Sequence, residues 1–116
     1  MKTFNIAMLA LMMALSFVSL TPVYAEVSQA AEDHLALAAS YEQKAQAQDT
    51  LIAEHQQMKK DYPGTLALSP KDTSSVRVQE MDKHCDAIIQ DATKLRNEFL
   101  EFAKWHQMRA AELQGR

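Results

Sequence analysis

Glycine and proline are scarce in this sequence, and most of them lie close together. Of the two glycines and three prolines among 116 residues, Pro63, Gly64 and Pro70 fall within one stretch, DYPGTLALSPKDTSS at 61–75. Because these residue types interrupt helices, their concentration predicts a single loop at about 62–73. We therefore expect two long helices, at about 27–61 and 72–113, built from segments rich in good helix formers.

The sequence lacks an apolar run long enough to span a bilayer. The run from Ile6 to Leu20 has about 15 residues, whereas a transmembrane helix needs about 20. Lys2 precedes this run, and the tripeptide VYA, which ends at Ala25, supplies the small or apolar residues that a signal peptidase accepts. We expect residues 1–25 to be a cleavable signal peptide, with no membrane span after the cut. Glu26, rather than the cysteine of a lipoprotein, follows, so the periplasm is the expected location.

A basic patch and a recognisable catalytic constellation are missing too. Removal of residues 1–25 leaves 116 − 25 = 91 residues with 11 Lys and Arg against 15 Asp and Glu, a net charge of about −4. This mild acidity argues against nucleic acid as a partner. Cys85 with His84 or His55 is the one conceivable nucleophile pair, and it lacks a third group and an oxyanion hole. The sequence therefore predicts a protein that is not an enzyme.

Heptad spacing in both predicted helices indicates how they pack. One stripe of the first helix has a spacing of seven residues: Val27, His34, Tyr41, Gln48, His55 and Tyr62. The second helix has a seam with steps of four and three: Met81, Cys85, Ile88, Ala92, Leu95, Phe99, Phe102, His106, Arg109 and Leu113. Such seams predict coiled-coil packing, and a short loop makes the two helices antiparallel. The fold class is therefore all-α, an antiparallel two-helix hairpin.

A two-helix hairpin of this size buries little surface, since small chains have an unfavourable ratio of surface to volume. We therefore expect a homodimer, in which two hairpins form a four-helix bundle. The alternative is a monomeric hairpin with a terminus that curls back over it.

All four histidines lie within the two predicted helices. In an antiparallel hairpin that turns between Tyr62 and about Ser74, the numbers of facing residues add up to roughly 136 to 140. Two levels of polar side chains result. The level near the loop collects His55, Met58, Met81, His84 and Cys85, and the level near the open end pairs His34 with His106.

Imidazole, thioether and thiolate groups together suit Cu(I) and other soft ions, and zinc accepts the histidine and cysteine members. The loop-proximal level is therefore a candidate copper or zinc site, and the His34 and His106 pair is a possible second site. Cys85, the only cysteine, cannot form an internal disulfide. It is a ligand, a free thiol or half of an intermolecular bridge. In the alternative interpretation these residues only pack, because methionine fills gaps and cysteine behaves as a small apolar residue.

The motifs AEDHLALAASYEQKA at 31–45, AEHQQMKKDY at 53–62 and MDKHCDAI at 81–88 resemble those of a group of small exported proteobacterial proteins of unassigned function. The resemblance covers most of the chain after residue 25. It implies a helical hairpin in which the His-x-x-Met and Met-x-x-His-Cys positions belong to the pattern, and it implies no activity.

Three functional hypotheses follow from the sequence. The first is a periplasmic metal-binding protein that uses the loop-proximal residues. The second is a structural or adaptor module whose exposed faces bind another envelope protein. The third is a holder of unfolded chains, which requires an apolar groove between hairpins.

Overall fold

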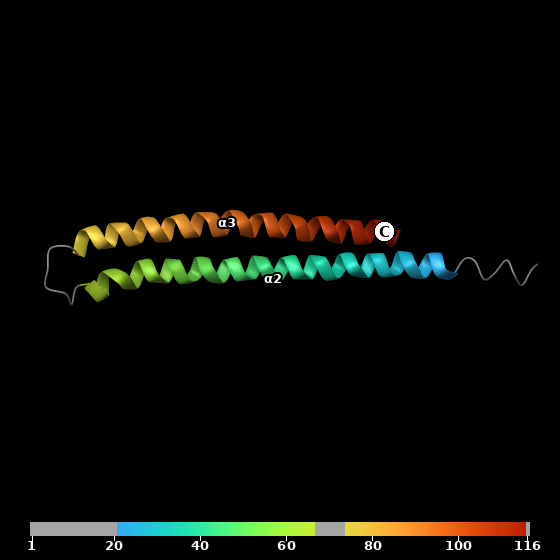
Figure 1. The fold of residues 1–116 in the computed structure, drawn as a ribbon, viewed down its shortest axis with the longest axis horizontal. Coiled ribbons are helices and arrows are strands. Elements are labelled where there is room, and N and C mark those ends of the chain that lie inside the picture. The colour runs from blue at the N-terminus through green and yellow to red at the C-terminus, as the bar shows by residue number, and fades with distance from the viewer. Residues whose placement is uncertain (1–20, 67–73, 116) are drawn as a thin grey trace, which may run out of the picture.

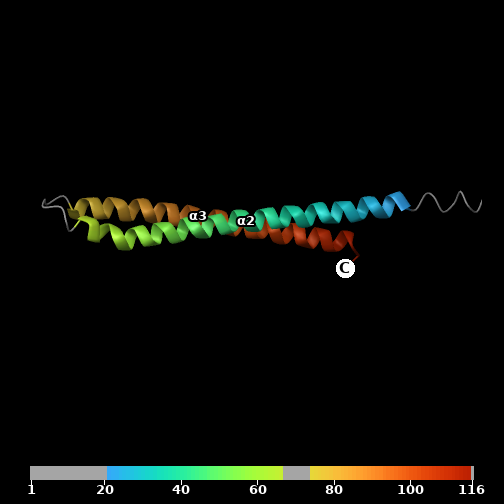
Figure 2. The ribbon, with the colours of Figure 1, turned by 90° about the horizontal axis from the view of Figure 1, so that it is seen from below.

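The protein is a hairpin of two long helices that lie side by side (Figure 1). The structure, a computed structural model, describes residues 21–66 and 74–115. Helix α2 spans Thr21–Leu66 and helix α3 spans Ser74–Leu113, and they pack against each other along their lengths. Figure 2 shows that the two helices cross at a shallow angle, as in coiled coils. The predicted all-α antiparallel hairpin is confirmed.

The helix ends differ from the predicted bounds by a few residues. Helix α2 begins at Thr21 and continues through Pro63 to Leu66, although an end near residue 61 was expected from the proline. Proline removes one backbone hydrogen bond and clashes with the preceding turn, which bends a helix without always ending it. The last turn of α2 indeed changes direction near the loop (Figure 1).

Helix α3 ends on a glycine cap. The backbone N–H groups of Gln114 and Gly115 donate to the carbonyl oxygens of Ala110 and Glu112, each at 3.0 Å. Gly115 has a φ of 72°, in the left-handed region that glycine adopts without a steric penalty. At the other end, α3 begins at Ser74.

Two parts of the sequence predictions lie outside the described residues: the apolar run at 6–20 and residues 67–73, which include most of the predicted loop and the expected start of the second helix. Among the residues that the structure describes, no helix is long and apolar enough to cross a membrane.

Small side chains form one row of the helix–helix interface, which we call the alanine row. In α2 it contains Ala31, Ala38 and Ala45, and in α3 it contains Ala103 and Ala110. Each of these five side chains is buried, and within each helix they are seven residues apart. Alanine lets two helix backbones approach closely, because the axial distance depends on the side chains at the contact.

Larger rings form the second row of the interface, the aromatic row. His34 faces His106, and Tyr41 lies 6.0 Å from Phe99 between ring centroids. The residue numbers of both facing pairs (34 and 106, 41 and 99) add up to 140, the upper end of the predicted range. One row of the interface therefore consists of small side chains and the other of large rings.

The predicted seam of α3 was right for one stripe and wrong for another. Cys85, Ala92 and His106 are buried as expected. Leu95 and Phe102, in contrast, are 40% and 52% exposed, and Ala103 and Ala110 occupy the interface instead. Small side chains allow close helix packing, so α3 is oriented about its axis with Ala103 and Ala110 towards α2. This orientation leaves Leu95 and Phe102 exposed.

Polar contacts between the helices flank the alanine row. The Arg96 guanidinium contacts Asp49 at 3.0 Å, and the Gln107 amide donates to Glu42 at 2.7 Å. Lys59 forms an ion pair with Asp86. Three cross-helix polar contacts thus close this side of the hairpin, which we call the ion-pair flank.

Candidate functional site

Two histidine rings meet across the helices near the loop. The centroids of the His55 and His84 rings are 6.0 Å apart, with an angle of 51° between the ring planes. His55 Nδ1 lies 2.9 Å from the carbonyl oxygen of Leu51, one turn earlier in α2. Since a carbonyl accepts and cannot donate, Nδ1 carries the proton, and the lone pair of the neutral ring is on Nε2. A hydrogen bond of this kind orients the imidazole of a metal ligand.

The other predicted ligands of this level are divided between different environments. Met81 is half-buried and lines a shallow groove with His84, Tyr62 and Glu80. Met58 is 39% exposed and lines a separate groove on α2. Cys85, at the same level as His55 in the observed register, is fully buried with 0% exposure. The structure therefore brings His55 and His84 together, with Met81 beside His84, while Met58 lies apart and Cys85 belongs to the core.

The separation of the two rings is compatible with one shared ion. A metal–nitrogen bond of about 2.0–2.1 Å puts an ion roughly 3.2 Å from the centre of an imidazole ring, so two ligating rings have centres at most about 6.4 Å apart. The 6.0 Å between His55 and His84 lies within that limit. Within residues 21–66 and 74–115, no group of three or more His, Cys, Asp or Glu side chains is arranged to hold an ion.

The two histidines at the open end, His34 and His106, form a hydrogen bond with each other. His34 Nδ1 and His106 Nδ1 are 2.8 Å apart, a hydrogen bond in which one ring donates and the other accepts. The His106 ring, itself buried, also stacks on Tyr41 at 5.6 Å and meets the edge of Trp105 at 4.8 Å. A metal ion at this pair would have to break the N–H···N bond, so the geometry favours a packing role for these two rings.

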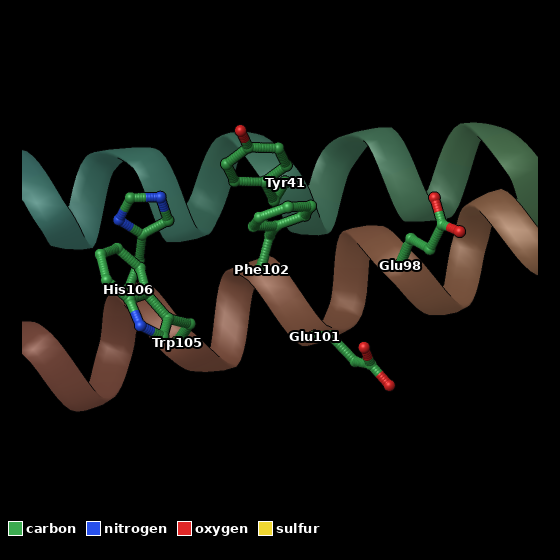
Figure 3. A pocket seen from close by; sticks show the side chains of 6 residues that line it. All are labelled: Tyr41, Glu98, Glu101, Phe102, Trp105 and His106. Carbon is green, nitrogen blue, oxygen red and sulfur yellow. The ribbon is translucent and has the colours of Figure 1, made fainter.

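An open aromatic groove runs beside this histidine pair (Figure 3). It has a volume of about 670 Å³ and is lined by Tyr41, Glu98, Glu101, Phe102, Trp105 and His106. The ring of Tyr41 stacks on Phe102 with centroids 5.3 Å apart. Lys44 Nζ lies 4.7 Å from the Tyr41 ring centroid, a cation–π contact. Sequence reasoning missed this groove, although Tyr41 occupies the histidine stripe of α2 and Phe102 the predicted seam of α3.

The ion pair between Lys59 and Asp86 raises the pKa of Lys59. The hydrogen bond from Lys59 to the Asp86 carboxylate raises the pKa of Lys59 above its ordinary 10.5, and the negative charges of Asp86 and Asp82 act in the same direction. Partial burial lowers the same pKa by a smaller amount. Lys59 therefore stays charged at neutral pH and couples the two helices electrostatically at the level of Cys85.

Comparison with known proteins adds no family: no family model, no curated protein and no solved structure matches this chain. The functional argument therefore depends on the residues and their geometry.

Proposed function

We propose that this protein is an exported, non-enzymatic metal-binding protein, and that His55 and His84 are its principal ligands. The observation that carries the proposal is the meeting of these two rings at 6.0 Å, from different helices, with His55 oriented by the Leu51 carbonyl. Two packed helices thus bring two imidazoles together before an ion binds, and the Leu51 carbonyl orients one of them.

The neighbouring donors determine which ion fits. Met81 and Glu80 line the groove next to His84, and the thioether of Met81 is the proposed third ligand. A thioether prefers Cu(I), whereas zinc and Cu(II) accept imidazole with a carboxylate. Copper is therefore the first candidate and zinc the second. The fully buried Cys85 thiol and the exposed Met58 are not ligands of this proposed site.

Titration of the purified, reduced protein with Cu(I), Zn(II) and Ni(II), with metal analysis after dialysis, tests the proposal. We expect one ion per chain with a Kd below the micromolar range, and at least a tenfold loss of affinity in His55→Ala and in His84→Ala. Met81→Leu should weaken Cu(I) binding and leave Zn(II) binding unchanged. Binding weaker than micromolar for all three ions would contradict the proposal.

A matched control distinguishes the histidine pair near the loop from the pair near the open end. His34→Ala also removes an imidazole that faces the opposite helix, and it should leave metal affinity unchanged. Loss of binding in His34→Ala, with normal binding in His55→Ala, would move the site to the open end. Cys85→Ala is preferable to serine as the thiol variant, because a hydroxyl at a fully buried position costs about 1–3 kcal/mol of stability.

A second function is favoured by a different observation, the exposure of large apolar side chains. Leu37, Leu95, Phe102 and Trp105 are each at least 40% exposed, and such surfaces commonly mark interaction sites. The second candidate is therefore a helical-bundle module of the cell envelope that associates with another chain, either a second copy in a four-helix bundle or another envelope protein.

A further inference from the structure

Apolar side chains cover one long face of the hairpin, next to the aromatic row. In α2 the residues at seven-residue spacing after Leu37 are Lys44, Leu51 and Met58, and in α3 those before Phe102 are Leu95, Ile88 and Met81. Lys44 lies over the Tyr41 and Phe99 rings, and Phe102 stacks on Tyr41, so both stripes border the aromatic row on its outer side. We call this surface the open face.

The open face remains outside the core of the hairpin. Leu37, Met58, Leu95 and Phe102 have exposed fractions of 46%, 39%, 40% and 52%, and the other apolar members, Leu51, Ile88 and Met81, are half-buried. The opposite side has its three cross-helix polar contacts in the ion-pair flank. The hairpin therefore has its continuous apolar stripes on the open face and its cross-helix polar contacts on the other side.

The core that the hairpin does bury is small. Among the described residues, the buried side chains are those of six alanines, Cys85 and His106, and Cys85 is the largest that is fully buried. Alanine removes little apolar area from water, and hydrophobic stabilisation is proportional to that area. Ordering each residue of two long helices costs about 1–2 kcal/mol. The stable state therefore needs more apolar surface to be covered than one hairpin covers by itself.

We propose that a second copy of this chain docks on the open face, so that two hairpins form a four-helix bundle; this specifies the interface of the second candidate function above. The area fits. The stripes from Leu37 to Met58 and from Met81 to Phe102 each cover 21 residue steps, about 32 Å at 1.5 Å per residue, and two helices are about 20 Å wide. The projected area of roughly 640 Å², larger as accessible surface, approaches the ~800 Å² that each partner buries in a standard interface.

The pattern of the face favours an identical partner. A two-fold contact is self-complementary, because each residue meets in the partner what the partner meets in it. The open face has two heptad stripes, one from each helix, which is what each half of a four-helix bundle presents to the other. Lys44 lies on the open face, and Glu98 lines the groove at its edge at nearly the same level. With the two-fold axis parallel to the helices, Lys44 of each copy faces Glu98 of the other.

Sedimentation velocity over a range of protein concentrations tests the proposal. The parent protein should be a dimer at micromolar concentration, and Leu95→Glu and Leu37→Glu should each raise the dissociation constant by at least about 100-fold, because a two-fold interface loses two buried leucines per substitution. Leu100→Glu and Leu35→Glu are matched controls. Their leucines are similarly exposed, at 47% and 44%, but follow Phe99 and His34 on the other side of each helix, and these variants should remain dimers.

A second measurement needs no variant and keeps the test informative if a glutamate variant loses its helical circular dichroism. Mixed light and heavy isotope-labelled parent protein, cross-linked with a carbodiimide, should give intermolecular Lys44–Glu98 products. A parent protein that is monomeric at 100 µM, or cross-links confined to the ion-pair flank, would overturn the proposal. Metal titration of Leu95→Glu separates the two proposals, since Leu95 is no ligand and its loss leaves the His55 and His84 pair present.

Discussion

The two sides of this hairpin differ in the size and chemistry of their side chains. On the alanine side, small side chains bring the helices together, and Arg96 with Asp49 and Lys59 with Asp86 bridge them above that row. On the aromatic side, histidine, tyrosine and phenylalanine rings pack against one another and line a groove. The first side is closed by the chain itself, whereas the second offers imidazoles, aromatic faces and apolar side chains to a ligand or a partner.

Under the proposed function, the side of the hairpin that packs most closely differs from the side that would bind a ligand. Close alanine packing depends on shape and tolerates no larger side chain, but contributes little hydrophobic free energy. The aromatic side carries the proposed metal ligands and the aromatic groove. His55 and His84 meet there near the loop, and the Tyr41 cluster lies there near the open end.

The largest expected effect comes from enlarging the alanine row. Ala38→Leu places a branched side chain where the helices touch, because Ala38 is only 3% exposed. Overpacking of this kind should lower the free energy of unfolding by about 2–3 kcal/mol. Urea denaturation at a fixed protein concentration measures the change. Ala39→Leu, one residue on and exposed, is the control and should change stability by less than about 0.5 kcal/mol; equal losses in both variants would refute the close contact.

The aromatic row should respond less strongly. His106→Leu removes the N–H···N bond with His34 and the stacking on Tyr41, with an expected loss of about 2 kcal/mol. A double-mutant cycle with His34→Leu isolates the pair, and its coupling energy should be about 1 kcal/mol. A coupling energy indistinguishable from zero would mean that the two rings act independently of each other.

The smallest effect belongs to the ion-pair flank and depends on pH. Because the pKa of Lys59 is raised in the folded protein, its contribution to stability is fully present below pH 10.5 and is lost as the pH rises through the raised value. The stability difference between the parent and Lys59→Met should therefore shrink between pH 9 and strongly alkaline pH. High salt should reduce it too, since both partners are partly exposed. Lys60→Met, at an exposed neighbouring position, should show no such trend.

Most of the fold could be predicted from the position of the helix breakers and from heptad spacing. The two helices, their antiparallel arrangement and the facing of His34 with His106 follow from the sequence and agree with the structure. The predicted helix bounds agree less well with the structure. Helix α2 extends past Pro63, because a proline removes one backbone hydrogen bond and can bend a helix without ending it.

The candidate site could be predicted only in part. Spacing alone put His55, Met58, Met81, His84 and Cys85 at one level, because a level is a matter of residue number. Which of them face a common space depends on the rotation of each helix about its axis. That rotation moved Cys85 fully into the core and left Met58 exposed. Loop-end metal binding therefore stays a prediction, now centred on His55 and His84.

The sequence by itself determined that the chain forms two long helices joined by one loop, since few breakers interrupt its helix-forming segments. It also determined the level at which each histidine lies, because 1.5 Å of rise per residue fixes axial position. Only the tertiary structure decided which side of each helix is buried. Either of two stripes of α3 could have been buried. Ala103 and Ala110 lie in the interface and Leu95 and Phe102 remain exposed, because close backbone contact requires small side chains. The apolar stripe that this choice left outside forms the face on which a second copy is proposed to dock.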